Sequence, residues 1–206
     1  MAYYRDSVTE ASWQLLQKLK REYKFCLIGG WAVWLYTKQL KSKDIDLVVA
    51  PEELSRIREK YALVKNDRLK KYEFRQGEVQ IDVYSAYYSD LGLAAELILD
   101  NQIIKEGFKI PAIELLIVLK LVAWIGRRGS GKGRKDLIDI VSLVDLGECQ
   151  KEKLTRWLKK TGMENAGKEL IKAIKQLSTM EELGLNQHQI ARRKKVWLER
   201  LENGKI

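Results

Sequence analysis

Two aspartates separated by one residue, Asp44 and Asp46, are spaced so that their carboxylates could act together on one ligand. Asp46 opens onto the apolar run 47–49, and a continuous apolar run is typical of a buried strand. Residues i and i+2 of a strand project from the same face, so both carboxylates are expected on one side of the strand's start. Neighbouring carboxylates repel each other and need a cation or another partner to stay ionised together. The pair therefore predicts a cation site.

Asp82 is a third carboxylate, placed inside segment 79–85, where apolar and polar side chains alternate. Such alternation predicts a strand with one buried face, and Asp82 shares its other side with Gln80 and Tyr84. Mg²⁺ prefers oxygen ligands and binds through one or two carboxylates together with substrate phosphates. We therefore expect Asp44, Asp46 and Asp82 to bind Mg²⁺ or Mn²⁺, with the ions of a two-metal site about 3.5–4 Å apart.

The pair Gly29-Gly30 lies between the apolar segment 25–28, expected to be a strand, and the segment 31–36, expected to be a helix. A strand that turns directly into a helix exposes backbone N–H groups at the helix N-terminus. Those groups and the helix dipole favour a phosphate there. Gly29 and Gly30 are therefore candidate phosphate-binding residues.

The elements that position these residues follow from hydrophobic periodicity and turn signals. Before Pro111 we expect helices over 7–22, 31–36 and from Pro51 onward, and strands over 25–28, 45–49, 72–75, 79–85 and, as a short pair, 103–110. After Pro111 we expect only helical stretches, over 113–125, 137–144, 154–158, 170–177 and 190–201. The fold class is therefore α+β, with a small mixed sheet and helices in residues 1–110 and an all-helical domain in residues 111–206.

The ordered set of Leu27-Ile28-Gly29-Gly30-Trp31-Ala32-Val33 followed by Ser42-Lys43-Asp44-Ile45-Asp46-Leu47-Val48-Val49 resembles the motif of the DNA polymerase β-like nucleotidyltransferases. Its Gly-Gly-x-Ala form is similar to the AbiEii/MenA toxin-like branch and to lincosamide-resistance enzymes. The resemblance implies a polymerase β-like core, with the substrate cleft between that core and the helical domain. It implies transfer of a nucleoside monophosphate from an NTP such as ATP to an acceptor, with release of pyrophosphate.

By the same resemblance, Asp44, Asp46 and Asp82 bind metal, and Asp82 also activates the acceptor. Gly29 and Gly30 cradle the triphosphate, Ser42 takes the place of a small hydroxyl residue, and Lys41 or Lys43 supplies the basic residue that precedes the acids. The branch also carries a lysine in an apolar helix and a Lys-Asp pair opening the next helix, which here are Lys120 and Lys135-Asp136. These three are expected to bind nucleotide; alternatively, Asp136 is a helix N-cap.

The segment 126–133 satisfies the spacing G-x-x-x-x-G-K, which begins a P-loop. Gly133 stands where a P-loop has Ser or Thr, and the segment follows a helix, whereas a P-loop follows a strand. We therefore expect a flexible basic loop between two helices. This loop and the basic run 192–195 could contact a nucleic-acid backbone, or they could simply be solvated.

Net charge is +10 in total, of which +2 belongs to residues 1–110 and +8 to residues 111–206. A basic half favours an anionic partner, so we expect an RNA acceptor such as tRNA, and possession of a cognate antitoxin is left open. The alternatives are a small-molecule transferase of the antibiotic type and a non-catalytic nucleic-acid-binding module. The longest apolar run is too short to cross a bilayer, and Cys26 and Cys149 lack metal-ligand spacing. We expect a cytoplasmic protein with no membrane partner.

Overall fold

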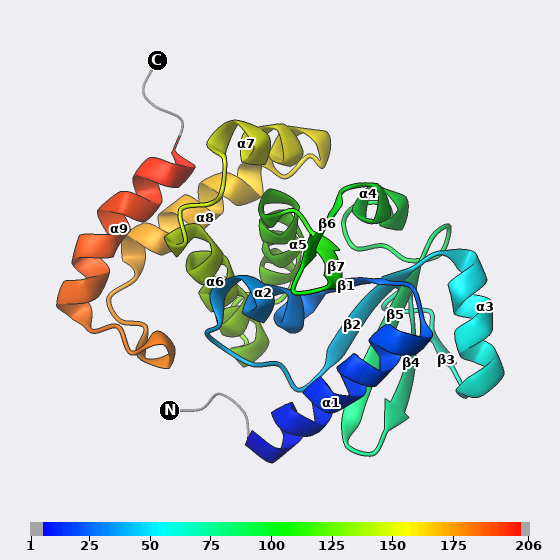
Figure 1. Cartoon of the computed structure of the whole chain (residues 1–206). Helices are drawn as coiled ribbons and strands as arrows, with labels where there is room; N and C mark the ends of the chain where they lie inside the picture. Colours follow the sequence, from blue (N-terminus) through cyan, green and yellow to red (C-terminus); the bar gives the residue numbers. More distant parts are fainter. Residues whose placement is uncertain (1–5, 203–206) are drawn as a thin grey trace. The chain divides into compact units, whose positions relative to one another are not determined.

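The computed structural model describes residues 6–202, which divide into two compact units, one ending at Ala112 and one beginning at Ile113. The first unit is built on a five-stranded sheet, and the second consists of helices (Figure 1). This is the α+β class that the sequence predicts. Within the described residues, no helix is both long and apolar enough to cross a membrane.

The first unit alternates helices with short strands. In chain order its elements are α1 (Asp6–Glu22), β1 (Cys26–Ile28), α2 (Gly29–Thr37), β2 (Ile45–Val49), α3 (Pro51–Lys60), β3 (Val64–Asn66), β4 (Lys71–Gln76), β5 (Val79–Ser85), α4 (Ala95–Asp100), β6 (Gln102–Lys105) and β7 (Phe108–Pro111). The main sheet has the strand order β1-β2-β5-β4-β3, in which only β2 and β5 pair in parallel. The strands expected within 103–110 are confirmed as β6 and β7, which form a separate antiparallel pair.

The two faces of the main sheet differ because its residues alternate. In β5 the side chains of Val79, Ile81 and Val83 are buried, whereas those of Gln80 and Asp82 are half-buried. Helices α1 and α3 contact β5, and α2 and α4 contact β2. The buried apolar side chains form the core, and burial of each one contributes about 1.5–3 kcal/mol to the stability of the fold. The polar face is left for the carboxylates.

Helix α2 is held by apolar and aromatic packing, because all nine of its residues except Gly29 and Trp34 are buried. The indole Nε1 of Trp31 donates a hydrogen bond of 2.9 Å to Ser12 Oγ, which ties α2 to α1. Trp31 is 1% exposed, so this bond lies in the core. The packing fixes the start of α2, where Gly29 and Gly30 lie.

The second unit contains five α-helices and one 3₁₀ turn among its described residues. They are α5 (Ile113–Gly126), α6 (Gly131–Asp145), α7 (Lys151–Lys160), α8 (Glu164–Gln176), η1 (Glu181–Leu183) and α9 (Gln187–Leu201). Helix α5 contacts α6, α7 and α8, which explains why it is apolar almost all round. Its one buried acid, Glu114, accepts a 2.7 Å hydrogen bond from the backbone N–H of Gln150. Helix α9 begins at a capping box formed by Asn186 and Gln189.

The structure also differs from the sequence prediction at several elements. Strand β3 and helix α4 are absent from the prediction; each is short, and β3 is largely exposed at the sheet edge. Helix α2 begins at Gly29, two residues earlier than expected. Helix α6 begins at Gly131, so the predicted loop of 126–135 is only four residues long.

Candidate active site

The carboxylates of β2 and β5 are brought side by side by the sheet register. Asp46 is the direct partner of Asp82 in the parallel pairing of these strands. Adjacent strands lie about 4.8 Å apart, and paired residues project to the same face. Both side chains are half-buried, and Asp44, also half-buried, lies immediately before β2. The structure therefore places two of the three predicted acids next to each other, with the third at the entrance to their strand.

Gly29 gives Asp46 the room that it occupies. Ile28, the last residue of β1, pairs with Asp46, and Gly29 follows with φ +68°, a left-handed conformation that glycine adopts without strain. A Cβ at Gly29 would overlap the Asp46 carboxylate and lie 2.7 Å from its Cγ. The Gly-Gly motif and the D-x-D motif are thus in direct contact, and α2 starts beside the Asp46 carboxylate.

Asp82 is bound by Gln80, which the sequence places on the same side of the strand, and by Lys71, which sequence reasoning missed. Lys71 Nζ lies 2.5 Å from Asp82 Oδ2 and 3.1 Å from Glu73 Oε2. Gln80 donates from Nε2 to Asp82 Oδ1 at 3.1 Å. Burial opposes the charge of Lys71, but the hydrogen bonds and charges of Asp82 and Glu73 outweigh it and raise the pKa of Lys71. Lys71 is therefore an ammonium ion that bridges two carboxylates.

These residues suit a divalent cation by the chemistry of their donors. Within residues 6–202, no three Asp, Glu, His or Cys side chains converge closely enough to hold a metal ion as they stand. Asp46 and Asp82 nonetheless offer hard carboxylate oxygens from one face, which are the ligands that Mg²⁺ and Mn²⁺ take. A positive charge already lies at Asp82, supplied by Lys71. Asp46 and Asp82 would therefore suit a divalent ion once Lys71 has moved away from Asp82.

The remaining predicted site residues of the first unit are Gly30, at the start of α2, and the three residues 41–43, which directly precede the D-x-D motif. Ser42 is buried, and Lys43 is half-buried with an interaction of its own. Lys41 is exposed. Gly30 is buried in the first turn of α2. The segment that precedes β2 therefore contains one buried hydroxyl and a partly enclosed lysine.

In the helical unit, the three predicted nucleotide-binding residues belong to one buried charge network. Lys120 Nζ lies 2.7 Å from Asp139 Oδ2 and 3.4 Å from Asp136 Oδ1. Lys135 Nζ lies 3.2 Å from Asp139 Oδ2, and burial lowers the pKa of Lys135. Arg127 donates to both oxygens of Asp136, from Nε at 2.6 Å and Nη2 at 2.9 Å. The structure thus brings Lys120, Lys135 and Asp136 together.

Arg127 and Asp139 complete this network; sequence reasoning placed Arg127 in the basic loop that could contact nucleic acid and gave Asp139 no functional role. The signal for Asp139 is present in the sequence, since Lys135 and Asp139 stand four apart on a helix. Asp136 is not the N-cap that the alternative interpretation required. That position belongs to Ser130, whose Oγ accepts a 3.0 Å hydrogen bond from Gly133 N.

The P-loop-like segment is a helix start. A tight turn runs from Arg127, the residue after α5, to Ser130, whose Oγ donates to Arg127 O at 2.7 Å. A Cβ at Gly133 would lie 2.9 Å from the carbonyl carbon of Arg127, so this position has no room for a side chain. The expected flexible loop over 126–135 is therefore wrong for its second half: Gly131 and the residues after it belong to α6. Gly133 is required by this close approach to the backbone of Arg127.

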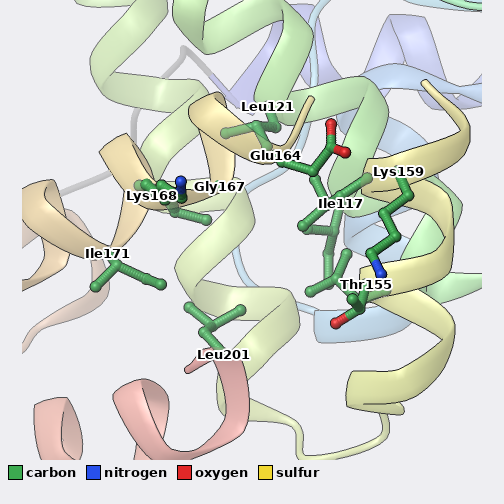
Figure 2. Close-up of a pocket in the computed structure, with 12 residues that line it drawn as sticks. Ile117, Leu121, Thr155, Lys159, Glu164, Gly167, Lys168, Ile171 and Leu201 are labelled. Atoms are coloured by element: carbon green, nitrogen blue, oxygen red, sulfur yellow. The ribbon is translucent and has the colours of Figure 1, made fainter. Parts of the chain in front are cut away.

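A hollow of about 280 Å³ lies elsewhere in the helical unit (Figure 2). Its walls come from α5, α7, α8 and α9 and are mostly leucine and isoleucine, including Leu121, Leu158 and Leu201. Lys159 and Glu164 lie at its rim in Figure 2. It contains none of the residues that the sequence marks for chemistry.

Several solved structures resemble this fold, whereas no family model and no curated protein matches the sequence. A candidate nucleotidyltransferase from Helicobacter pylori is 15% identical, with 97% of this chain and 100% of that chain covered and a TM-score of 0.51. JHP933 from Helicobacter pylori is 14% identical, with coverage of 95% and 92% and a TM-score of 0.50. An antigenic nucleotidyltransferase-like protein from Paracoccidioides brasiliensis is 19% identical, with coverage of 78% and 92% and a TM-score of 0.45. These likenesses show that this chain shares its fold with the two Helicobacter structures, one of which is described as a nucleotidyltransferase.

Proposed function

We propose that this protein is a metal-dependent nucleotidyltransferase. The observation that carries the proposal is the register pairing of Asp46 with Asp82, beside the glycine turn that opens α2, in a nucleotidyltransferase-like fold. Asp44, Asp46 and Asp82 would hold Mg²⁺ or Mn²⁺. Divalent ions bound there stabilise the attacking and leaving oxygens of an in-line displacement at phosphorus.

The NTP substrate, for example ATP, would bind through the residues that the sequence marks for nucleotide. Gly29 and Gly30 are the first two residues of α2, and backbone N–H groups at the start of a helix favour phosphate. Ser42, Lys43, Lys120, Lys135 and Asp136 complete the proposed nucleotide-binding set. Lys120 and Lys135 are buried and bound to Asp139, so a nucleotide phosphate would have to replace that carboxylate as their partner.

In the proposed reaction the acceptor hydroxyl gives its proton to Asp82 and its oxygen bonds to the α-phosphorus of the NTP. The bond from that phosphorus to the bridging oxygen breaks, and pyrophosphate leaves. The acceptor is proposed to be RNA, such as tRNA, because residues 111–206 carry a net charge of +8. The AbiEii/MenA-like motif further supports a role as a toxin with a cognate antitoxin.

The proposal is tested by incubating the purified protein with each α-labelled NTP, Mg²⁺ and total RNA. We expect label to enter one RNA class with one preferred NTP. Residues that only orient metal ligands already contribute about 10–100-fold, so Asp46→Asn should lower the rate by about 100-fold or more. Asp100→Asn, an exposed acid at the end of α4, is the matched control and should keep full activity. Label transferred equally by Asp46→Asn would exclude this site.

A further inference from the structure

Lys71 occupies the side of Asp82 that the proposed reaction needs. It is the first residue of β4, on the strand next to β5, and its side chain is only 10% exposed. Its ammonium is within ion-pair distance of both Asp82 and Glu73. Gln80 takes the second oxygen of Asp82. Both oxygens of this carboxylate are therefore engaged by protein donors.

An ammonium and a divalent ion compete for the same carboxylate oxygen. Mg²⁺ lies about 2.0–2.1 Å from its oxygen ligands, so an ion on Asp82 Oδ2 would meet the Lys71 ammonium at very short range. Two cations this close in a partly buried site repel strongly, because screening by water is weak there. Binding of the ion to Asp82 therefore requires Lys71 to move.

Glu73 offers the ammonium a second partner on the same face. It is the direct partner of Asp82 in the antiparallel pairing of β4 with β5. Its side chain is 28% exposed, more than the 14% of Asp82, so it lies on the solvent side of the pair. Lys71 can leave Asp82 and keep its bond to Glu73. The same ammonium also neutralises the acids while no metal is bound.

We propose that Lys71 is a positioning residue that occupies Asp82 in the metal-free protein and must be displaced onto Glu73 before a divalent ion binds. Lys71 thereby sets the metal concentration at which the site becomes complete. This inference rests on the proposed function, since it requires a metal at Asp82. It assigns Lys71 no contact with the substrate.

The test is the affinity of the full chain for Mn²⁺, measured by calorimetry without nucleotide. Lys71→Met should bind Mn²⁺ about 10- to 100-fold more tightly than wild type, which corresponds to removing one competing charge-assisted hydrogen bond. A gain of affinity cannot come from damage to the fold. Lys70→Met is the matched control, because it removes the same charge from the neighbouring, exposed residue. It should change the affinity by less than about twofold at roughly 1 M KCl, where the Debye length is about 3 Å.

A double-mutant cycle tests the role of Glu73. Glu73→Gln should weaken Mn²⁺ binding in the wild-type background, because the displaced ammonium then has no second partner. In the Lys71→Met background the same change should have a clearly smaller effect, since coupled residues are not additive. If Lys71→Met does not fold, Lys71→Gln replaces it, because its amide can still donate a hydrogen bond to Asp82.

The outcomes separate this inference from the proposed function. Equal Mn²⁺ affinity in wild type and Lys71→Met, with binding lost in Asp46→Asn, overturns the role of Lys71 and leaves the metal site standing. An equal gain in Lys70→Met also overturns it, because the effect is then one of general surface charge. Absence of Mn²⁺ binding in all variants, or full binding in Asp46→Asn, overturns both.

Discussion

The carboxylate of Asp46 lies against the α-carbon of Gly29, so closely that a methyl group at Gly29 would come within 2.7 Å of Asp46 Cγ. Gly29 also has φ +68°, which disfavours any L side chain. These are two separate reasons for glycine at one position. They make Gly29 a sensitive test of the site.

Gly29→Ala should displace Asp46 and lower both metal affinity and stability. Gly77→Ala is the matched control, because Gly77 has φ +59° and a methyl group added there would have no atom within 4 Å. The control should lose about 1–2 kcal/mol of unfolding free energy from backbone strain alone. Gly29→Ala should lose clearly more, measured by urea denaturation. Equal losses would mean that Asp46 moves aside without cost.

Lys120 and Lys132 should differ in their effect on NTP binding. Lys120 is buried and bonded to Asp139, whereas Lys132 is exposed in the first turn of α6. Lys120→Met, which keeps most of the side-chain volume, should weaken NTP affinity about tenfold or more, the contribution of a charge-assisted hydrogen bond. Lys132→Met should leave it unchanged. Fluorescence titration with NTP analogues measures both, and equal losses would return a nucleotide role to the glycine-rich segment.

The buried pairing of Asp136 should contribute strongly to stability. Its side chain is 2% exposed and is bound by Arg127 and Lys120. Asp136→Asn removes the negative charge that balances these buried cations, and breaking such a buried ion pair lowers the free energy of unfolding by about 3–5 kcal/mol. Glu169→Gln breaks only exposed pairs with Arg128 and Lys172, which water screens, so it should cost clearly less unfolding free energy than Asp136→Asn. Chemical denaturation that gives similar losses would contradict this ranking.

RNA binding, if it occurs, should weaken steeply with salt, because each neutralised phosphate releases counterions. Arg127 is unsuited to the test, since its guanidinium binds Asp136. Lys132, Arg192 and Lys195 are exposed, and their combined replacement by alanine should flatten the salt slope by up to about 0.7–0.9 per residue.

The matched control for RNA binding is a variant with three exposed residues of the first unit replaced by alanine. These are Lys18 and Arg21 in α1 and Lys24 in the loop after it. It removes the same charge and should leave the slope nearly unchanged. A flat slope in the wild type would remove the RNA hypothesis and favour a small acceptor. Equal flattening in both triple variants would mean that RNA binding is not concentrated in the basic half.

The two cysteines should be unreactive in the native state. Burial raises the pKa of Cys26 and of Cys149 to about 12. Because the unfolded chain releases these protons first, the free energy of unfolding should fall as pH rises from the ordinary thiol range to about 12. At pH 8 the thiolate population should be about 10³-fold below that of the unfolded chain, so thiol reagents should label slowly until urea is added. Cys149 is half-buried and should react before Cys26; rapid labelling of Cys26 would contradict its burial.

Much of the acidic site could be predicted from local sequence patterns. The alternation of 79–85 gives the face on which Asp82 lies. The predicted strands 72–75 and 79–85 leave a three-residue link, whereas β4 continues to Gln76 and leaves a two-residue turn, and this register pairs Glu73 with Asp82. The apolar pattern predicts a strand that begins at Tyr72, one residue late, and so it misses Lys71. Strand ends are poorly marked when the terminal residue is charged.

The start of α6 could not be read from helix propensity. Glycine disfavours helix by about 1 kcal/mol per residue, and the segment contains Gly131 and Gly133. Tertiary contacts override this preference, because Ser130 caps the helix and Gly133 packs on the backbone of Arg127. Likewise, no local pattern reveals that Arg127 reaches Asp136. Ion pairs between helices depend on how the helices pack.

The strand order of the main sheet determines which strand pairings can form first during folding. Strands β4 and β5 are joined by a two-residue turn, and such hairpins form in about 1–10 μs. The parallel pairing of β2 with β5 must first close a loop that contains α3, β3 and β4, which is slower because of its entropic cost. The newly made chain should therefore bring Lys71 to Asp82 before Asp46 arrives. The two acids then become neighbours only after one of them already has its counterion.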